Sequence, residues 1–341
     1  MTIKKQHILY ILSIFITLIV VFIINIRYGS ANITLNDFLD FIRFKLPKES
    51  TVHQILWQIR IPSALAAILV GACLSVSGLL MQTLFNNPLA GPYVLGISSG
   101  ASIGVAILLM SGPLLSLPVL LIESPWSLTL AAALGSLMVL LIIIGVIKKL
   151  KNTFSILIIG LMLSSFTGAI ITLLSYFSSA ENLQKFTFWS MGNINLIQWD
   201  ALLVLSSISL ICFIVITFLI KPLNALLLGE NYARSLGVSF EKVRLVILII
   251  TGVLTGSVTA LAGPVAFIGL AVPQMTKLLF KTSDHLVLIV SSSLLGATIL
   301  LICDLISELP GFNSTLPLNA MTSLFGAPIV IFLLLKPLKN D

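Results

Sequence analysis

Long apolar runs recur along the whole chain and constrain its fold more than any other feature of the sequence. Roughly 20 apolar residues cross the hydrocarbon core of a bilayer as a helix, and about ten runs approach that length. They lie at approximately residues 8–26, 61–82, 93–110, 126–147, 153–177, 199–220, 243–262, 265–281, 286–306 and 317–335. Because backbone polar groups find no water inside lipid, each run is predicted to form a helix.

The low charge of the chain excludes a water-soluble globular fold. Charged residues make up 9% of the sequence, against roughly 25% in soluble domains. The short alternating segments of a membrane β-barrel are missing, so we expect an all-α polytopic membrane protein. The run at 8–26 is too long for a signal peptide and no cleavage site follows it, so it is expected to be retained. No linker divides residues 1–341, which are predicted to form a single transmembrane domain.

Basic residues predict the orientation of the chain. If the N-terminus is cytoplasmic, 13 of the 19 Lys and Arg residues fall on the cytoplasmic side, as the positive-inside rule requires. This set is Lys4, Lys5, Lys148, Lys149, Lys151, Lys221, Arg234, Lys242, Arg244, Lys277, Lys281, Lys336 and Lys339. Ten spans then place both termini in the cytoplasm. The formal charge of +7 follows from this topology and from anionic lipid, so no nucleic-acid partner is expected.

Candidate groups for catalysis, metal binding or ion coupling are few. Three cysteines without motif spacing are expected to be small buried residues: Cys73, Cys212 and Cys303. Asp304, with Glu308 just beyond it, stands near the outer end of a run and is expected to be a solvated helix end. Ion-coupled transporters usually keep ionisable groups at mid-membrane, and no G-x-x-x-x-G-K-[ST] motif occurs. The sequence therefore predicts no enzyme activity, no metal and no cofactor, and an energy source outside this chain.

Small residues at four-residue spacing predict close helix packing. Gly71 and Ser75 repeat in one run, and Gly252, Gly256 and Ala260 repeat in another. Such ridges let helix backbones approach each other in lipid.

Two segments combine apolar residues with helix breakers. The segment "NNPLAGPYVLGISSGAS" runs from Asn86 to Ser102, and a second break is predicted from Gly263 to Pro273. Irregular backbone at membrane depth survives only where protein buries it or where it faces a cavity. The residues expected to form these breaks are Asn87, Pro88, Gly91, Pro92, Gly96, Gly263, Pro264 and Pro273.

The cytoplasmic connection at about residues 221–242 is predicted to be structured. Pro222 is expected to end a helix, and residues 223–236 can form a short amphipathic helix that Gly229 breaks and Gly237 caps. This connection is typical of a docking surface, or alternatively of an interfacial helix that lies on the headgroups.

The connection between residues 29 and 58 lies on the outer side. Its stretch "NITLNDFLDFIRF" predicts a short surface helix. Such a helix is either an ordinary amphipathic connection or a rim for an external partner.

Four blocks of the sequence carry a resemblance to a known family. They are "RIPSALAAILVGACLSVSGLLMQTLFNNPLAGPYVLGISSGAS" from Arg60, "LLLGENYARSLGV" from Leu226, "LAGPVAFIGLAVPQMTKLL" from Leu261 and "LPLNAMTSLFGAPIVIFLLL" from Leu316. In this order they resemble the FecCD-type permeases, the membrane subunits of ABC importers for iron–siderophore complexes, haem and vitamin B12. The resemblance implies a type II importer-like permease with about ten helices in the bacterial plasma (inner) membrane.

The resemblance also implies partners and a pathway. A second permease protomer is expected, as a homodimer, together with two cytoplasmic P-loop ATPases and an external substrate-binding protein. The solute would pass between the permeases, beside the helix breaks. A ferric siderophore is the expected solute, with vitamin B12 or haem as alternatives. An ion-coupled secondary transporter or a structural membrane scaffold are the alternatives of a different class.

Roles carried over by the resemblance fall on two places. The family's ATPase-coupling loop matches Gly229, Glu230, Ala233, Leu236 and Gly237. Arg60 matches the first basic residue of an R-[LIV]-P-R pattern that seats acidic residues of the binding protein.

The chain departs from the family pattern at four positions. Ser63 replaces the second Arg of the docking pattern, and Glu308 stands where a further Arg is usual. This chain therefore has fewer positive charges at the expected docking site for the binding protein than the family pattern has, and one position carries a negative charge instead. Gln274 stands where His is frequent, and Asn319 where Gly is usual.

Overall fold

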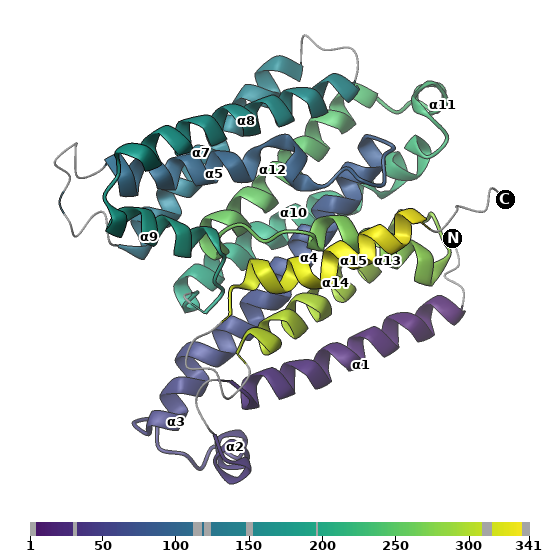
Figure 1. The fold of residues 1–341 in the computed structure, drawn as a ribbon. Coiled ribbons are helices and arrows are strands. Elements are labelled where there is room, and N and C mark those ends of the chain that lie inside the picture. The colour runs from purple at the N-terminus through teal and green to yellow at the C-terminus, as the bar shows by residue number, and fades with distance from the viewer. Residues whose placement is uncertain are drawn as a thin grey trace. The chain divides into compact units, whose positions relative to one another are not determined.

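Helices make up every regular element of the residues that the computed structural model describes, which are 5–29, 33–111, 118, 124–147, 153–195, 197–308 and 316–335 (Figure 1). In chain order they are α1 (Lys5–Arg27), α2 (Leu35–Ile42), α3 (Thr51–Gln54), η1 (Ile55–Arg60), α4 (Ile61–Leu84), η2 (Pro92–Leu95), α5 (Ile97–Ala106), η3 (Ile107–Ser111), α7 (Pro125–Ile147), α8 (Thr153–Phe177), α9 (Ala180–Ser190), α10 (Trp199–Leu226), α11 (Glu230–Ser235), α12 (Phe240–Ala262), α13 (Ile268–Phe280), α14 (His285–Ser307) and α15 (Leu318–Leu335). Six of the predicted cytoplasmic cations lie outside the described residues: Lys4, Lys148, Lys149, Lys151, Lys336 and Lys339.

Each of the ten predicted runs corresponds to an apolar helix. Among the described residues, seven helical stretches are long and apolar enough to cross a membrane: α1, the continuous α3–η1–α4 helix, α7, α8, α10, α12 and α14. Three shorter apolar helices cover the remaining runs, at Ile97–Ser111, Ile268–Phe280 and Leu318–Phe332. The first two are short because each follows a break in the backbone. The all-α polytopic fold is confirmed.

The chain divides into two compact units. Unit 1 comprises Met1–Val76, Asn193–Ser207 and Val265–Asp341, and unit 2 comprises Ser77–Gly192 and Ile208–Pro264. The predicted single domain stays a prediction.

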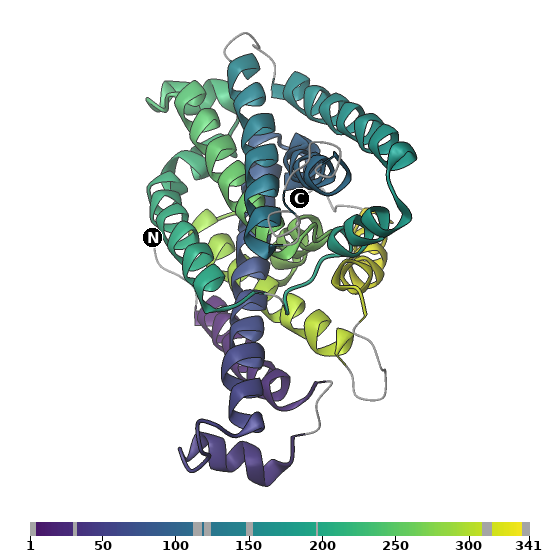
Figure 2. The ribbon, with the colours of Figure 1, turned by 90° about the vertical axis from the view of Figure 1, so that its left-hand side faces the viewer.

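In unit 1, α14 packs against α1, α13 and α15 (Figures 1 and 2). The contact between α4 and α14 depends on the small residues that the sequence pointed to. A Cβ added at Gly71 would overlap the backbone of Gly296, and the Ser75 hydroxyl donates a 2.6 Å hydrogen bond to the Gly71 carbonyl. Close packing at this ridge is therefore confirmed.

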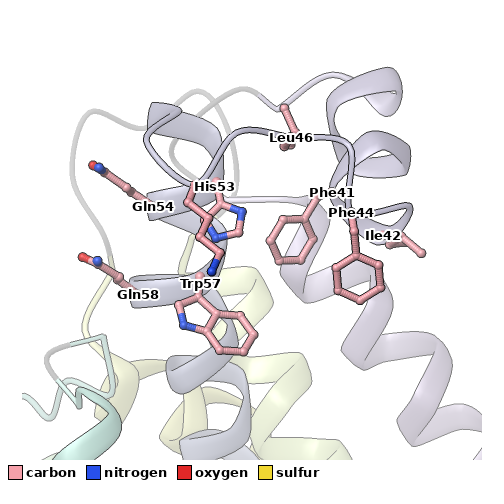
Figure 3. Close-up of a pocket in the computed structure, with 9 residues that line it drawn as sticks. Phe41, Ile42, Phe44, Leu46, His53, Gln54, Trp57 and Gln58 are labelled. Atoms are coloured by element: carbon pink, nitrogen blue, oxygen red, sulfur yellow. The ribbon is translucent and has the colours of Figure 1, made fainter.

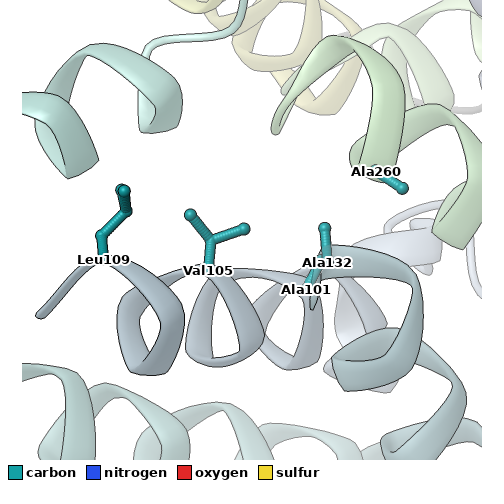
Figure 4. Packing of buried hydrophobic residues seen from close by; sticks show 5 residues of the cluster. All are labelled: Ala101, Val105, Leu109, Ala132 and Ala260. Atoms are coloured by element: carbon teal, nitrogen blue, oxygen red, sulfur yellow. The ribbon is translucent and has the colours of Figure 1, made fainter. Parts of the chain in front are cut away.

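In unit 2, α5 packs against α7, α8 and α12. Its core contains Ala101, Val105, Leu109, Ala132 and Ala260, and the first three follow one line along α5 and η3 (Figure 4). The second predicted ridge also packs closely: a Cβ at Gly252 would lie 2.5 Å from Leu140 Cδ1, and one at Gly256 would lie 2.8 Å from Ser136 Oγ. These contacts place α12 directly against α7.

Two proline positions differ from the prediction. Pro222 does not end a helix but lies inside α10, which continues to Leu226. Pro273 likewise lies inside α13, so the predicted break does not reach this residue. Membrane helices tolerate proline because local adjustments and neighbouring groups satisfy the freed carbonyls. The predicted outer surface helix is confirmed as α2, with Thr34 as its N-cap.

Candidate functional site

Two glycines with positive φ define the ends of the short helix α11. Gly229 precedes the helix with φ +94° and ψ 156°, a conformation that is essentially restricted to glycine. Gly237 follows it with φ +83°. The Gly237 amide donates to the Arg234 carbonyl at 3.0 Å, and the Val238 amide donates to the Ala233 carbonyl at 3.1 Å. This pair of bonds is a Schellman cap, so the predicted cap at Gly237 is confirmed.

An ion-pair network fixes the exposed side of α11. The Arg234 guanidinium donates to Glu230 Oε1 at 2.9 Å and also to Glu241 in the first turn of α12. The hydrogen bonds from Arg234 to Glu230 and Glu241 raise the pKa of Arg234 above its usual value. Arg234 and Glu241 were not among the predicted coupling residues, although the i, i+4 spacing of Glu230 and Arg234 indicated the first pair.

The surface around α11 combines one buried contact with several exposed apolar side chains. Ala233 is fully buried, and α11 packs against α12. Four large apolar side chains near it are about half exposed or more: Leu227, Leu228, Tyr232 and Leu236. Exposed apolar side chains gathered around one short helix are typical of a protein-docking site.

The segment after α4 is irregular as predicted. Asn86 has φ +45°, the Asn87 side chain accepts a 2.9 Å hydrogen bond from the Leu89 amide, and a 3-10 turn begins at Pro92. Gly96 then has φ +73°, where an added Cβ would lie 2.9 Å from the Gly160 carbonyl oxygen. Gly91, Pro92 and Gly96 are buried, whereas Pro88 is exposed. Most of this irregular backbone is therefore shielded by protein, as membrane depth requires.

The second break lies between α12 and α13 and is shorter than predicted. Gly263 has φ +73°, Phe267 has φ +64°, and α13 begins at Ile268. The Ala266 amide donates a 3.1 Å hydrogen bond to Asn319 Oδ1. Asn319, a departure from the family pattern, thus satisfies a backbone donor that the break leaves outside a helix.

Arg60 lies in a polar cluster of unit 1 rather than on an exposed surface. It is 5% exposed, and its Nη1 donates to the carbonyls of Ile26 at 3.0 Å and Arg27 at 2.5 Å. An added Cβ at Gly29 would lie within 3 Å of both Glu308 Oε2 and Arg60 Nη2, so these two side chains meet beside Gly29. α1 and Glu308 enclose Arg60, and the docking role that the family resemblance implies for it stays a prediction.

The carboxylates near the end of α14 are also enclosed. Asp304 is 2% exposed and accepts a 3.0 Å hydrogen bond from the Asn25 side chain, so the expected solvated helix end is wrong there. Glu308 is half-buried. Burial raises the pKa of Glu308, while its hydrogen bond with Asn195 and the Arg60 charge oppose that shift. Asn195 in turn accepts a 2.7 Å hydrogen bond from Ser63, the other departure at this site.

The three cysteines are buried as predicted: Cys73, Cys212 and Cys303. Within the described residues, no group of three or more His, Cys, Asp or Glu side chains could hold a metal ion.

In the described part of the chain, ten apolar helices and two backbone breaks define a multi-pass membrane protein. The model of the FecCD transport family matches residues 17–336, and the chain belongs to this family. It is a permease subunit of an ABC importer in the plasma (inner) membrane, and ATP hydrolysis takes place on a separate ATPase subunit.

Relatives with assigned functions are similar over nearly the whole chain. The vitamin B12 import system permease BtuC of Shigella boydii is 34% identical over 336 residues, which cover 98% of this chain and 97% of the relative. BtuC of Escherichia coli O1:K1 / APEC is 38% identical over 284 residues, with 82% and 83% covered. A solved structure described as an inward-facing metal-chelate type ABC transporter has a TM-score of 0.82 at 27% identity, covering 95% of this chain and 98% of the other.

Proposed function

We propose that this permease imports vitamin B12. The observation that carries the proposal is the similarity to BtuC proteins, at 34% identity over 98% of the chain. The expected ferric siderophore becomes the second candidate, supported by the structural similarity to a metal-chelate type transporter. Haem is the third candidate.

We further propose that α11 receives the movement of the ATPase. The structure around this helix supports the proposal. The Gly229 turn and the Gly237 cap fix the ends of α11, and an ion pair of Arg234 with Glu241 connects it to α12. Leu228 and Leu236 are exposed apolar side chains beside it. Two ATPase subunits and a second copy of the permease are the partners of this proposal. The irregular segment from Gly91 to Gly96 is proposed to border the translocation pathway of the solute. The other residues proposed to border this pathway are Asn87, Pro88, Gly263, Pro264 and Pro273.

We propose a structural role for Arg60 in place of the docking role. Its guanidinium joins the end of α1 to Glu308 and is almost fully buried. An external binding protein, also part of this proposal, would then dock through other groups.

Uptake in the native host tests the substrate and the coupling helix together. The host carries either the wild-type chain or Glu230→Lys, and uptake of radiolabelled cyanocobalamin and of ferric siderophores is measured. We expect Glu230→Lys to abolish cobalamin uptake without loss of membrane insertion, because the reversed charge repels Arg234 and opens the network. The matched control is Glu181→Lys, which breaks another exposed i, i+4 pair, with Lys185 at 2.9 Å.

The possible results separate the two proposals. If Glu230→Lys loses only the uptake of ferric siderophore, the substrate is the siderophore rather than vitamin B12, and the coupling role of α11 still holds. Wild-type uptake of both solutes in Glu230→Lys would remove α11 as the coupling element.

A further inference from the structure

A hollow of about 810 Å³ opens between α2 and the α3–η1 helix of unit 1. Figure 3 shows Phe41 and Phe44 on one side of it and His53 and Trp57 on the other. Ile42 and Leu46 add apolar surface, and Lys48 is the charged residue of the lining. Its size and its aromatic lining are typical of a site for a largely apolar ligand.

The level of the hollow relative to the bilayer follows from Arg60. Because Arg60 donates to the last carbonyls of α1, it stands level with the outer end of that membrane helix. The helix from Thr51 to Leu84 is continuous over 34 residues. At 1.5 Å per residue, Trp57 lies about 5 Å and His53 about 10 Å outward of Arg60. The headgroup region is roughly 5–7 Å thick on each side, so the Trp57 end of the hollow lies at headgroup level and the His53 end lies just outside it.

The helix α2 has the surface of an interfacial helix. Leu35, Leu39 and Ile42 repeat at i, i+4 and i+7 and are each exposed, and Phe44 beyond them is 96% exposed. The Trp57 ring lies 5.2 Å from the Trp199 ring, and the Trp199 indole donates to the Trp57 carbonyl at 2.9 Å. Tryptophans concentrate at the membrane–water interface, so this pair supports an interfacial position for the hollow.

We propose that this hollow binds an anionic phospholipid of the outer leaflet. The upper part of an acyl chain lies against Phe41, Phe44 and Trp57, and the phosphate pairs with Lys48 at the edge of the hollow. The positive charge of Lys48 attracts a lipid of net negative charge more strongly than zwitterionic phosphatidylcholine, whose choline cation offsets the charge of its phosphate. A lipid seated there would hold α2 against the extension of α4, on the outer face of the permease.

Fluorescence quenching by brominated lipid tests the proposal. The full chain carries Trp126→Phe and Trp189→Phe, which leaves Trp57 and Trp199 as reporters, and it is reconstituted in phosphatidylcholine vesicles. Phosphatidylglycerol or phosphatidylcholine with brominated acyl chains is then titrated in. We expect phosphatidylglycerol to quench with about fivefold selectivity, since one basic residue contributes about 1 kcal/mol toward anionic lipid.

Two exposed lysines supply the variant and its control. Lys48→Gln should reduce the selectivity toward one, whereas Lys45→Gln, outside the hollow, should leave most of it. No selectivity in the wild type, or equal losses in both variants, would overturn the proposal in favour of ordinary boundary lipid. Absence of quenching by either lipid would also overturn it, because the hollow would then face water and suit a protein partner.

Discussion

The cap at Gly237 gives the sharpest test of how α11 is built. With φ +83°, this residue closes the helix through two backbone hydrogen bonds, to the carbonyls of Arg234 and Ala233. A residue with a side chain costs about 1–2 kcal/mol in the left-handed conformation, although Asn is tolerated better. An added Cβ at Gly237 meets no atom within 4 Å. Backbone strain is therefore the cost that the structure assigns to Gly237→Ala.

This cost converts into a measurable change of amide exchange. A free energy of about 1–2 kcal/mol is a factor of roughly 5 to 30 in the equilibrium between the capped and the frayed helix end. In the purified full chain, hydrogen–deuterium exchange at residues 230–238 should accelerate by up to this factor in Gly237→Ala, and by less in Gly237→Asn. Gly145→Ala is the control, since Gly145 also has open space around it but lies inside α7 without a positive φ.

The ranking of the variants decides the interpretation. Equal exchange in the wild type and Gly237→Ala would refute the cap as the element that orders α11. If Gly237→Asn exchanged as fast as Gly237→Ala, the cause would not be the left-handed backbone.

Two further predictions concern unit 1. Asn319→Leu removes the acceptor of the Ala266 amide and should lower the free energy of unfolding by about 1–3 kcal/mol. The measurement is the thermal midpoint of unfolding in detergent, with Ser323→Ala as the control. A midpoint of Asn319→Leu equal to that of the control would contradict this prediction. Glu308 has a raised pKa, so the folded state binds its proton more tightly and stability from this group falls as pH rises above the normal carboxyl range. The thermal midpoint of the wild type minus that of Glu308→Gln should therefore increase as pH falls from neutral toward 5, and an unchanged difference would remove Glu308 as the titrating group.

The membrane helices could be predicted because their signal is local. Apolar length alone indicated all ten, and glycine with proline indicated the breaks at Asn86–Ser102 and after Ala262. The Gly237 cap was visible for the same reason, since a helix end depends on a few neighbouring residues.

The environment of individual polar residues could not be predicted in this way. Asp304 is buried because Asn25, which is 279 positions away in the sequence, donates to it. Arg60 is buried because the end of α1 offers two carbonyls and Glu308 lies beside it. The family pattern implied that Arg60 contacts an external binding protein, but Ser63 and Glu308 change the charges around it. Such contacts depend on tertiary packing, which one sequence without its relatives does not reveal.

Within unit 2, one continuous set of contacts connects α11 with the first helix break. Ala233 is buried on α11, which packs on α12, and α12 packs on α5. The hydroxyls of Ser98 on α5 and Thr259 on α12 lie 3.2 Å apart, and Ser98 is two residues beyond Gly96. Close-packed interiors transmit displacement because they contain few voids. A movement imposed on α11 by an ATPase would therefore act through α12 on the start of α5, where the buried irregular backbone lies.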